Sequence, residues 1–291
     1  MTNRSLSRRH AAYRDDIGDL TTRRPLPGPH VEQVSPFLFL NHHGPQVYPP
    51  GNAGLPFGPH PHRGFETVTF ILEGELAHRD SGGHESVIRA GGVQWMTAGS
   101  GLVHAEVSPE EFKRHGGPLE ILQLWVNLPA RLKFTKPAYQ GLQREDIPAI
   151  STPGAQGVVH LIAGEWGGRK GPIESLTGVF MSTVSLNRGA RVSFPDVAKR
   201  NVFLYVARGS VRVGTEGVPE YTLAELDDEG DTVEIEASTD ATVIFGHADP
   251  IDESMVAHGP FVMNTRREIE EAIHDYQAGK FGPLQQPPQA R

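Results

Sequence analysis

Short runs of β-branched and aromatic residues recur along this chain, and glycine closes most of them. Residues 66–72 read ETVTFIL and end just before Gly74, and residues 119–128 read LEILQLWVNL. The 33 glycines and 24 prolines are spread along the chain rather than gathered in one segment. Strands of this length, separated by turn residues, are typical of a β-sandwich or β-barrel. The sequence therefore predicts an all-β protein.

A weak internal repeat predicts two copies of one β fold. Residues 70–76 read FILEGEL and residues 205–211 read YVARGSV, and each stretch suggests a strand, a glycine turn and a returning strand. The two turn glycines, Gly74 and Gly209, are 135 positions apart (209 − 74). A chain of 291 residues is long enough for two domains of ordinary size.

One segment has a helical pattern. Residues 265–277 read TRREIEEAIHDYQ, in which Thr265 and Glu268 form a capping box. Gly279 can end this helix. Four apolar residues recur at helical spacing and form one stripe that can pack on a barrel: Ile269, Ala272, Ile273 and Tyr276.

Composition excludes several classes of protein. The chain has no cysteine, so disulfide scaffolds, thiol nucleophiles and iron–sulfur clusters are excluded, and any metal must be held by nitrogen and oxygen. The net charge of −8 argues against a nucleic-acid surface. No stretch approaches the ~18 apolar residues that a membrane span needs. The first residues, MTNRSLSRRHAAYRDD, lack the apolar core of a secretory signal. We therefore expect a cytoplasmic protein without nucleic-acid or membrane partners.

Two pairs of residues carry the chemistry. His60 and His62 are two positions apart, and so are His104 and Glu106. In a strand, residues i and i+2 point to the same face, so each pair presents both side chains to one side. Two such strands lying side by side would bring three imidazoles and one carboxylate together around a metal ion. Imidazole and carboxylate suit Fe, Mn, Ni, Cu or Zn, and four protein ligands leave two positions open on an octahedral metal.

Other interpretations of these residues remain open. A lone His-x-His pair is more often a loop feature than a metal site, His104 alone could be a core histidine, and Glu106 could face solvent. Glu66 lies at an even offset from His60 and His62 and competes with Glu106 for the role of carboxylate ligand. If it is not a ligand, it could hydrogen-bond to a ligating imidazole and orient it.

The remaining sequence contains no rival catalytic motif. GxGxxG, the P-loop and HExxH are all absent. His78, His84 and His115 lie in segments rich in turn-forming residues, and we expect them to be exposed.

The histidine motif lies in a longer stretch that resembles the pirin family. The strings PHPHRGFETVTFILEGELAHRDS and QWMTAGSGLVHAE carry the resemblance, as does GPFVMNTRREIEEAIHDYQAGKFG near the end. It covers about residues 20–282. It implies two cupin domains, which are jelly-roll-type β-barrels, with a metal, usually iron, in the N-terminal one. The implied ligands are His60, His62, His104 and Glu106.

The resemblance also sets the expected domain boundaries. The C-terminal copy is expected to lack metal, because Pro195 and Val197 stand where His60 and His62 stand when the 135-position offset is applied. The expected parts are an N-terminal arm (1–30), a metal-binding cupin domain (31–134), a connecting segment (135–175), a C-terminal cupin domain including the helix 265–277 (176–282) and a tail (283–291).

The resemblance implies an enzyme of the quercetin 2,3-dioxygenase type, as among bacterial pirins, which opens a flavonol ring with O2. Its cofactor would be one divalent metal ion, with Fe(II) as the first expectation. Glu106 would take the proton of the 3-hydroxyl group as general base, with Glu66 as the alternative. For the wall that a flat aromatic substrate needs, we single out Phe65, Trp95 and Met96, although core packing explains Trp95 and Met96 equally well.

Two other functions compete with the enzyme. Pirin-type proteins are also linked to regulation, in which the metal would act as a redox-dependent switch and the protein would bind a partner without turnover. A barrel stabilised by a structural metal is the third interpretation, although two open coordination positions would be unusual in that role. The sequence alone does not choose the metal, the natural substrate or the oligomeric state.

Overall fold

The chain folds into two compact units, which the computed structural model describes from residue 2 to residue 284. Unit 1 consists of the residues up to 15, 23–42 and 145–250, and unit 2 consists of 16–22, 43–144 and the residues from 251 on. Strands dominate both units, and the described residues contain two α-helices, α1 (Glu110–His115) and α2 (Arg266–Gln277). The prediction of an all-β protein is thus confirmed. The expected tail (283–291) lies outside the described residues from residue 285 on.

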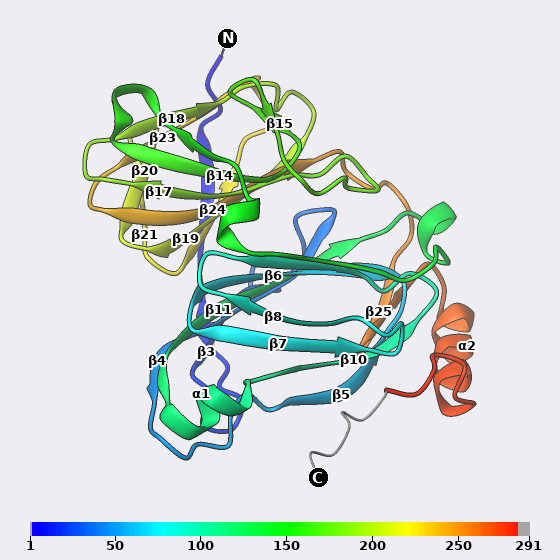
Figure 1. Cartoon of the computed structure of the whole chain (residues 1–291). Helices are drawn as coiled ribbons and strands as arrows, with labels where there is room; N and C mark the ends of the chain where they lie inside the picture. The colour runs from blue at the N-terminus through cyan, green and yellow to red at the C-terminus, as the bar shows by residue number, and fades with distance from the viewer. Residues whose placement is uncertain (1, 285–291) are drawn as a thin grey trace. The chain divides into compact units, whose positions relative to one another are not determined.

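Unit 2 is a barrel of antiparallel strands. The inner faces of its two sheets are joined by hydrogen bonds from side chains of β6, β9 and β11 to a carboxylate on β10. The smaller sheet (Figure 1) has the order β5 (Phe57–His62), β10 (Leu102–Val107), β7 (Glu75–Asp80) and β8 (Glu85–Arg89). The larger sheet has the order β12 (Ala138–Leu142), β9 (Val93–Thr97), β6 (Phe65–Glu73), β11 (Gly117–Asn127) and β4 (Phe37–Tyr48), of which residues 43–48 belong to this unit.

Unit 1 repeats this arrangement. Its smaller sheet has the order β18 (Arg191–Phe194), β23 (Val233–Ala237), β20 (Ser210–Val213) and β21 (Glu216–Pro219). Its larger sheet has the order β1 (Leu6–Ala11), β22 (Thr222–Leu226), β19 (Asn201–Arg208), β24 (Ala241–Ala248), β17 (Phe180–Leu186), β14 (Gly157–Ala163) and β13 (Ala149–Ser151). The order β18-β23-β20-β21 corresponds to β5-β10-β7-β8, and β22-β19-β24-β17 corresponds to β9-β6-β11-β4. The two units are therefore two copies of one topology, as the internal repeat predicts.

The interiors of the two barrels are filled differently. In unit 1, β19 and β24 pair Leu204 with Phe245, and both side chains belong to a large apolar core. In unit 2, the residue 135 positions before Leu204 is Thr69, and its partner on β11 is Gln123. Apolar side chains thus fill the middle of unit 1, whereas unit 2 keeps polar side chains inside that can support a site.

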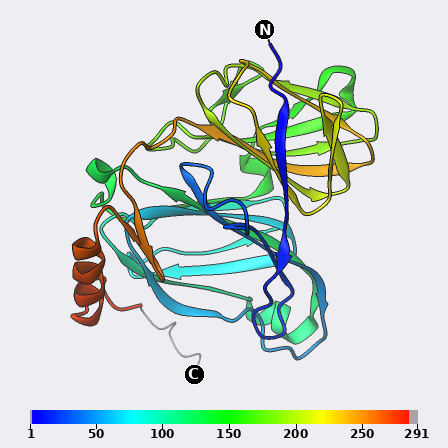
Figure 2. The same cartoon turned by 180° about the vertical axis from the view of Figure 1, so that it is seen from behind.

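Helix α2 forms where its capping box and apolar stripe predict it. Thr265 accepts a hydrogen bond from the backbone N–H of Glu268, the reciprocal bond is present, and Ile269 is buried. In Figures 1 and 2 the helix lies beside the hairpin of β25 (Val256–His258) and β26 (Phe261–Met263). Arg63 Nη1 donates to Asp275 Oδ2 at 3.0 Å and so ties the helix to the end of β5.

This division differs from the boundaries expected from the sequence. The helix 265–277, expected in the C-terminal domain, lies in unit 2, and β1 of the expected arm lies in unit 1, so the expected domain boundaries stay a prediction. The expected connection 135–175 contains β12, β13 and β14 as well as a hairpin of β15 (Glu165–Trp166) and β16 (Arg169–Lys170). A capping box predicts that a helix forms, but its packing surface depends on contacts such as Arg63–Asp275, which join residues 212 positions apart. No helix among residues 2–284 is long and apolar enough to span a membrane.

Replacing Lys133 by methionine is expected to destabilise unit 2. Lys133 is buried, and its Nζ donates to Gly64 O (2.9 Å), Asn127 Oδ1 (2.8 Å) and Val262 O (2.9 Å). Methionine would leave these acceptors without a donor, at a cost of about 2–4 kcal/mol in the free energy of unfolding. Urea denaturation checks this, with Lys136→Met at an exposed position as the control. Equal stabilities of the two variants would contradict the anchoring role of Lys133.

Candidate metal centre

Three histidines converge inside unit 2. His60 and His62 lie at the end of β5, and His104 on β10 is directly opposite His60 in the antiparallel register. One ring nitrogen of each histidine lies within 4.8 Å of the others. The distance between ring centroids is 4.3 Å for His60–His104, 4.9 Å for His62–His104 and 4.8 Å for His60–His62. The i, i+2 spacing in the sequence therefore does bring these three imidazoles together.

The protonation and burial of these rings fit a bound metal. His60 Nδ1 donates to Gly58 O at 2.7 Å and His62 Nδ1 donates to Pro260 O at 3.3 Å, which leaves the lone pair of each ring on Nε2. His62 Nε2 and both ring nitrogens of His104 are buried, and no described residue hydrogen-bonds to them. A buried polar atom without a partner costs about 1–3 kcal/mol, and a metal ion would remove that cost.

Burial keeps His62 and His104 neutral, as metal ligation requires. Burial, together with the neighbouring His60 ring, lowers the pKa of His62 to about 3. Burial lowers the pKa of His104 well below its ordinary value, and the nearby histidines add to the effect. Three convergent imidazoles, two of them held neutral by burial, are a donor set that suits a divalent transition metal.

Glu106, the expected fourth ligand, is buried on β10 but stands outside the histidine group. Its carboxylate accepts hydrogen bonds from Thr69 Oγ1 (3.1 Å), from Gln123 Nε2 (2.5 Å) and from Gln94 Nε2. The register of β10 with β5 shifts by one residue between His104 and Glu106, so that Glu106 lies opposite Phe57. The ligand role of Glu106 therefore stays a prediction, since the carboxylate would have to exchange some of these bonds for the metal.

Glu66, the rival carboxylate, lies on the other face of its sheet. Thr69 on β6 points to Glu106, and side chains alternate along a strand, so Glu66 points away from the histidines. Its carboxylate accepts from Thr97 Oγ1 at 2.6 Å, and Trp95 hydrogen-bonds to it as well. Burial raises the pKa of Glu66 despite these bonds. Glu66 and Trp95 thus form a separate buried polar pair on the face of the β6 sheet that points away from the histidines.

Two aromatic rings pack against His62: Phe65, which the sequence analysis expects there, and Trp125, which it missed. Phe65 lies 5.1 Å from the His62 ring, and Trp125 lies 5.4 Å from His62 and 4.4 Å from Phe65, all between ring centroids. Met96 pairs with Thr67 and packs in a small apolar cluster with Leu102, so its place in the wall stays a prediction. Trp125 is recognisable only through pairing, because β11 aligns it with Thr67 on the inner face of β6.

Comparison with known proteins decides the family. The family model described as Pirin matches residues 19–126, and the model described as Pirin C-terminal cupin domain matches residues 181–282. A Pseudomonas aeruginosa protein named "Putative quercetin 2,3-dioxygenase" is 40% identical over 250 residues, which cover 86% of this chain and 87% of that protein. The chain belongs to the pirin family. Rat pirin is 38% identical over 267 residues, which cover 89% of this chain and 87% of the rat protein.

Solved structures of pirins and related cupins share this fold. The crystal structure of a quercetin 2,3-dioxygenase from Acinetobacter baumannii matches with a TM-score of 0.90 at 34% identity, covering 98% of this chain and 100% of that one. A bacterial pirin from Escherichia coli, solved in complex with nickel(II), matches with a TM-score of 0.67 at 21% identity, covering 84% of this chain and 99% of that one. At that identity, the second match supports the fold alone.

His78 is a further buried histidine of this pirin, contrary to the expectation that it is exposed. It lies opposite Glu106 in the register of β7 and β10, and its ring centroid is 5.5 Å from that of His104. Its Nε2 donates to Asp80 Oδ2 at 3.1 Å, and its ring stacks on Tyr139 at 4.0 Å. The signal in the sequence is the alternation Leu76-x-His78-x-Asp80, which puts both polar residues on the buried face of the strand.

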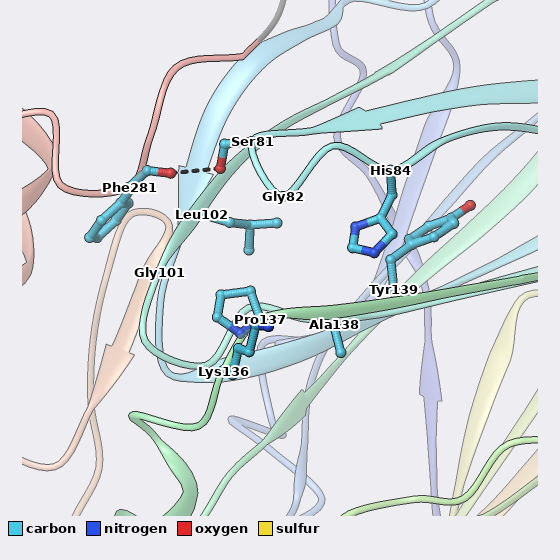
Figure 3. A pocket seen from close by; sticks show the side chains of 10 residues that line it. All are labelled: Ser81, Gly82, His84, Gly101, Leu102, Lys136, Pro137, Ala138, Tyr139 and Phe281. Atoms are coloured by element: carbon cyan, nitrogen blue, oxygen red, sulfur yellow. Dashed lines mark hydrogen bonds between the residues drawn. The ribbon is translucent and has the colours of Figure 1, made fainter.

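The exposure predicted for His84 and His115 agrees with the structure, with side chains 45% and 73% exposed. His84 lines a cavity of about 590 Å³ in unit 2. Figure 3 shows His84 beside Tyr139 in this cavity, with Ser81 donating to the Phe281 carbonyl at 2.6 Å. None of the expected wall residues lines this cavity. The cavity contacts the histidine group only indirectly: Tyr139 in its lining stacks on His78, and the His78 ring lies beside that of His104.

Proposed function

We propose that this pirin is a metal-dependent dioxygenase of the quercetin 2,3-dioxygenase type, which opens a flavonol-like aromatic ring with O2. The observation that carries the proposal is the set of three convergent imidazoles, in which His62 Nε2 and both ring nitrogens of His104 have no partner among the described residues. The dioxygenase name of a relative at 40% identity supports it. Fe(II) is the first candidate for the ion, and the same donors suit Mn, Ni, Cu and Zn.

His60, His62 and His104 would hold the metal, and Glu106 would be the fourth ligand. When bound, the metal supplies Lewis-acid stabilisation of an ionised substrate oxygen and a common site for substrate and O2. Phe65 and Trp125 pack against His62 and offer aromatic faces to a flat ligand.

Glu106 is our candidate for the general base that takes the proton of the substrate hydroxyl group. Gln94 and Gln123 hold its carboxylate in a defined orientation on the same inner face as the histidines. A base must lie within hydrogen-bond reach of the proton that it removes, and Glu66 faces the other side of the sheet. We therefore propose Glu106 rather than Glu66 for this role.

Oxygen consumption tests this function. Iron-loaded protein with quercetin is expected to take up O2, and His62→Ala is expected to lower the rate at least ~100-fold, because the substitution removes a donor that the metal needs. His115→Ala, an exposed histidine on α1, is the matched control and should keep the full rate. The circular dichroism of all variants should agree. No uptake by protein that holds a full complement of iron would contradict the proposal.

A regulatory role is the second candidate, and the burial of two of the three donors favours it. His62 and His104 are only 2% and 1% exposed, whereas His60 is partly exposed, so a bound metal would be shielded from solvent by two of its ligands. A metal held in this way could act as a redox-sensing element in a protein that binds a partner without turnover. This second function would explain full iron loading without O2 consumption. A cytoplasmic location stays a prediction under both functions.

A further inference from the structure

Unit 1, the barrel without a histidine group, has a cavity of its own. Its volume is about 520 Å³, which is in the range of ~300–1,000 Å³ typical of small-molecule sites. Nothing in the proposed dioxygenase function uses it. Its walls come from the β15–β16 turn, the start of β17, the end of β18 with the two residues after it, and the end of β24: Glu165, Trp166, Gly167, Gly168, Phe180, Ser193, Phe194, Pro195, Asp196 and His247.

This cavity lies at the end of unit 1 that corresponds to the metal end of unit 2. Val202 is 135 positions after Thr67, and it pairs with His247 as Thr67 pairs with Trp125. His247 therefore occupies the position of Trp125, which packs against His62 in unit 2. Pro195, which stands where His60 stands when the 135-position offset is applied, lines the cavity.

Aromatic rings held in place by their neighbours form the walls. Phe180 stacks on His247 at 4.7 Å with an interplanar angle of 9°, and Phe194 stacks on Phe245 at 3.9 Å. Trp166 lies 5.7 Å from Phe194, and its indole Nε1 donates to Ser193 O at 3.0 Å. These rings need little reordering to receive a flat ligand, which lowers the entropic cost of binding.

His247 supplies a hydrogen-bond donor of defined tautomer. Arg200 Nε donates to His247 Nδ1 at 2.7 Å, so the proton of the neutral ring is on Nε2. Burial lowers the pKa of His247 to about 3, and the charges of Arg200 and Arg4 add to this effect, so the ring stays neutral. Within residues 2–284, no side chain accepts a hydrogen bond from His247 Nε2.

The polar rim carries negative charge. Glu165 and Asp196 line the cavity and are exposed, while its lining contains no lysine or arginine. Carboxylates accept hydrogen bonds from hydroxyl groups and repel anions. The cavity thus combines aromatic faces and one N–H donor with a rim of acceptors.

We propose that this cavity binds a planar, neutral aromatic compound with hydroxyl groups at opposite ends. The ring would lie against Trp166 and Phe194, one oxygen would accept from His247 Nε2, and the opposite hydroxyl would donate to Glu165 or Asp196. Aromatic carboxylates are disfavoured by the same rim. The site is independent of the metal centre and of the dioxygenase function.

Calorimetric titration with naphthalene-2,6-diol tests the site, because the two hydroxyl groups of this probe are too far apart to chelate a metal. The full-length protein is expected to bind it saturably, and the matched anion naphthalene-2,6-dicarboxylate should bind at least ~10-fold more weakly. The double variant Glu165→Gln, Asp196→Asn should also weaken diol binding at least ~5-fold, since amides are poorer acceptors than carboxylates. Asn tolerates the left-handed backbone of Asp196 (φ 63°).

Three controls locate the binding. Glu216→Gln, at an exposed position outside the cavity, should bind the diol as the wild type does. His62→Ala should also bind it unchanged, because its substitution affects only the candidate metal site. The protein has 3 tryptophans, and quenching of their fluorescence by the diol should disappear in Trp166→Phe. Absence of saturable binding, unchanged affinity in the double variant, loss of binding in His62→Ala or persistent quenching in Trp166→Phe would each overturn the proposal.

Discussion

Replacing His104 by leucine is expected to abolish metal binding by this pirin. His104 is the most buried of the three convergent histidines, and neither of its ring nitrogens has a hydrogen-bond partner within residues 2–284. The purified wild type should hold about one metal ion per chain, and the variant less than about a tenth of that. Elemental analysis after dialysis against nickel(II) and iron(II) measures this directly.

The same substitution makes a second, thermodynamic prediction. In the presence of a chelator, His104→Leu should be at least as stable as the wild type, because it removes two buried nitrogens that lack hydrogen bonds. Nickel(II) at 100 times its Kd should stabilise the wild type by about 2.7 kcal/mol and leave the variant unchanged. His115→Leu, at an exposed position, should respond to nickel as the wild type does. Retention of a full equivalent of metal by His104→Leu would place the donors elsewhere.

Replacing Gly64 by alanine is expected to have the largest effect on stability. Gly64 lies between His62 and Phe65 with φ of 90°, and a Cβ atom there would lie 2.0 Å from Val262 O and 2.8 Å from Met263 Sδ. The backbone of β26 would have to move, and with it the hydrogen bond from Val262 N to Arg63 O (3.1 Å). We expect a loss of about 3 kcal/mol or more, which corresponds to a fall in Tm of about 6–12 °C.

Gly51→Ala is the matched control for this effect. Gly51 also has a positive φ, 74°, but nothing lies within 4 Å of the position of its Cβ atom. It should therefore lose only the ~1 kcal/mol that alanine costs in a left-handed conformation. Differential scanning calorimetry of both variants separates backbone strain from the clash. Similar melting temperatures would mean that β26 moves away from Gly64 at little cost.

The contrast between the two units explains how one topology holds two kinds of interior. At corresponding positions, unit 2 has Thr69 and Gln123, which hold the carboxylate of Glu106, and unit 1 has Leu204 and Phe245, which pack in an apolar core. A buried carboxylate without such donors would be costly. The polar lining of β6 and β11 is therefore a condition for the site in unit 2.

Local patterns in the sequence determined the parts of this protein that depend on neighbouring residues alone. The glycine-punctuated strands, the helix that begins after Thr265 and the common face of His60 and His62 follow from strand alternation and capping, which act over a few positions. The pairing of β5 with β10, which brings His104 to His60 and His62, agrees with the expectation that the two strands carrying these residues lie side by side.

Only the tertiary structure decided which strands lie opposite one another, and with that the surroundings of each carboxylate. Glu66 faces away from the histidines because the turn at Arg63 and Gly64 separates β5 from β6, so the alternation of one strand does not carry over to the other. Trp125 and His78 enter the site through strand pairing. Helix α2 packs on unit 2 through an apolar cluster that joins Ile269 to Val103 and through the bond from Arg63 to Asp275, which spans 212 positions. Contacts between distant segments form only when the whole chain folds, so patterns of neighbouring residues do not predict which segments will meet.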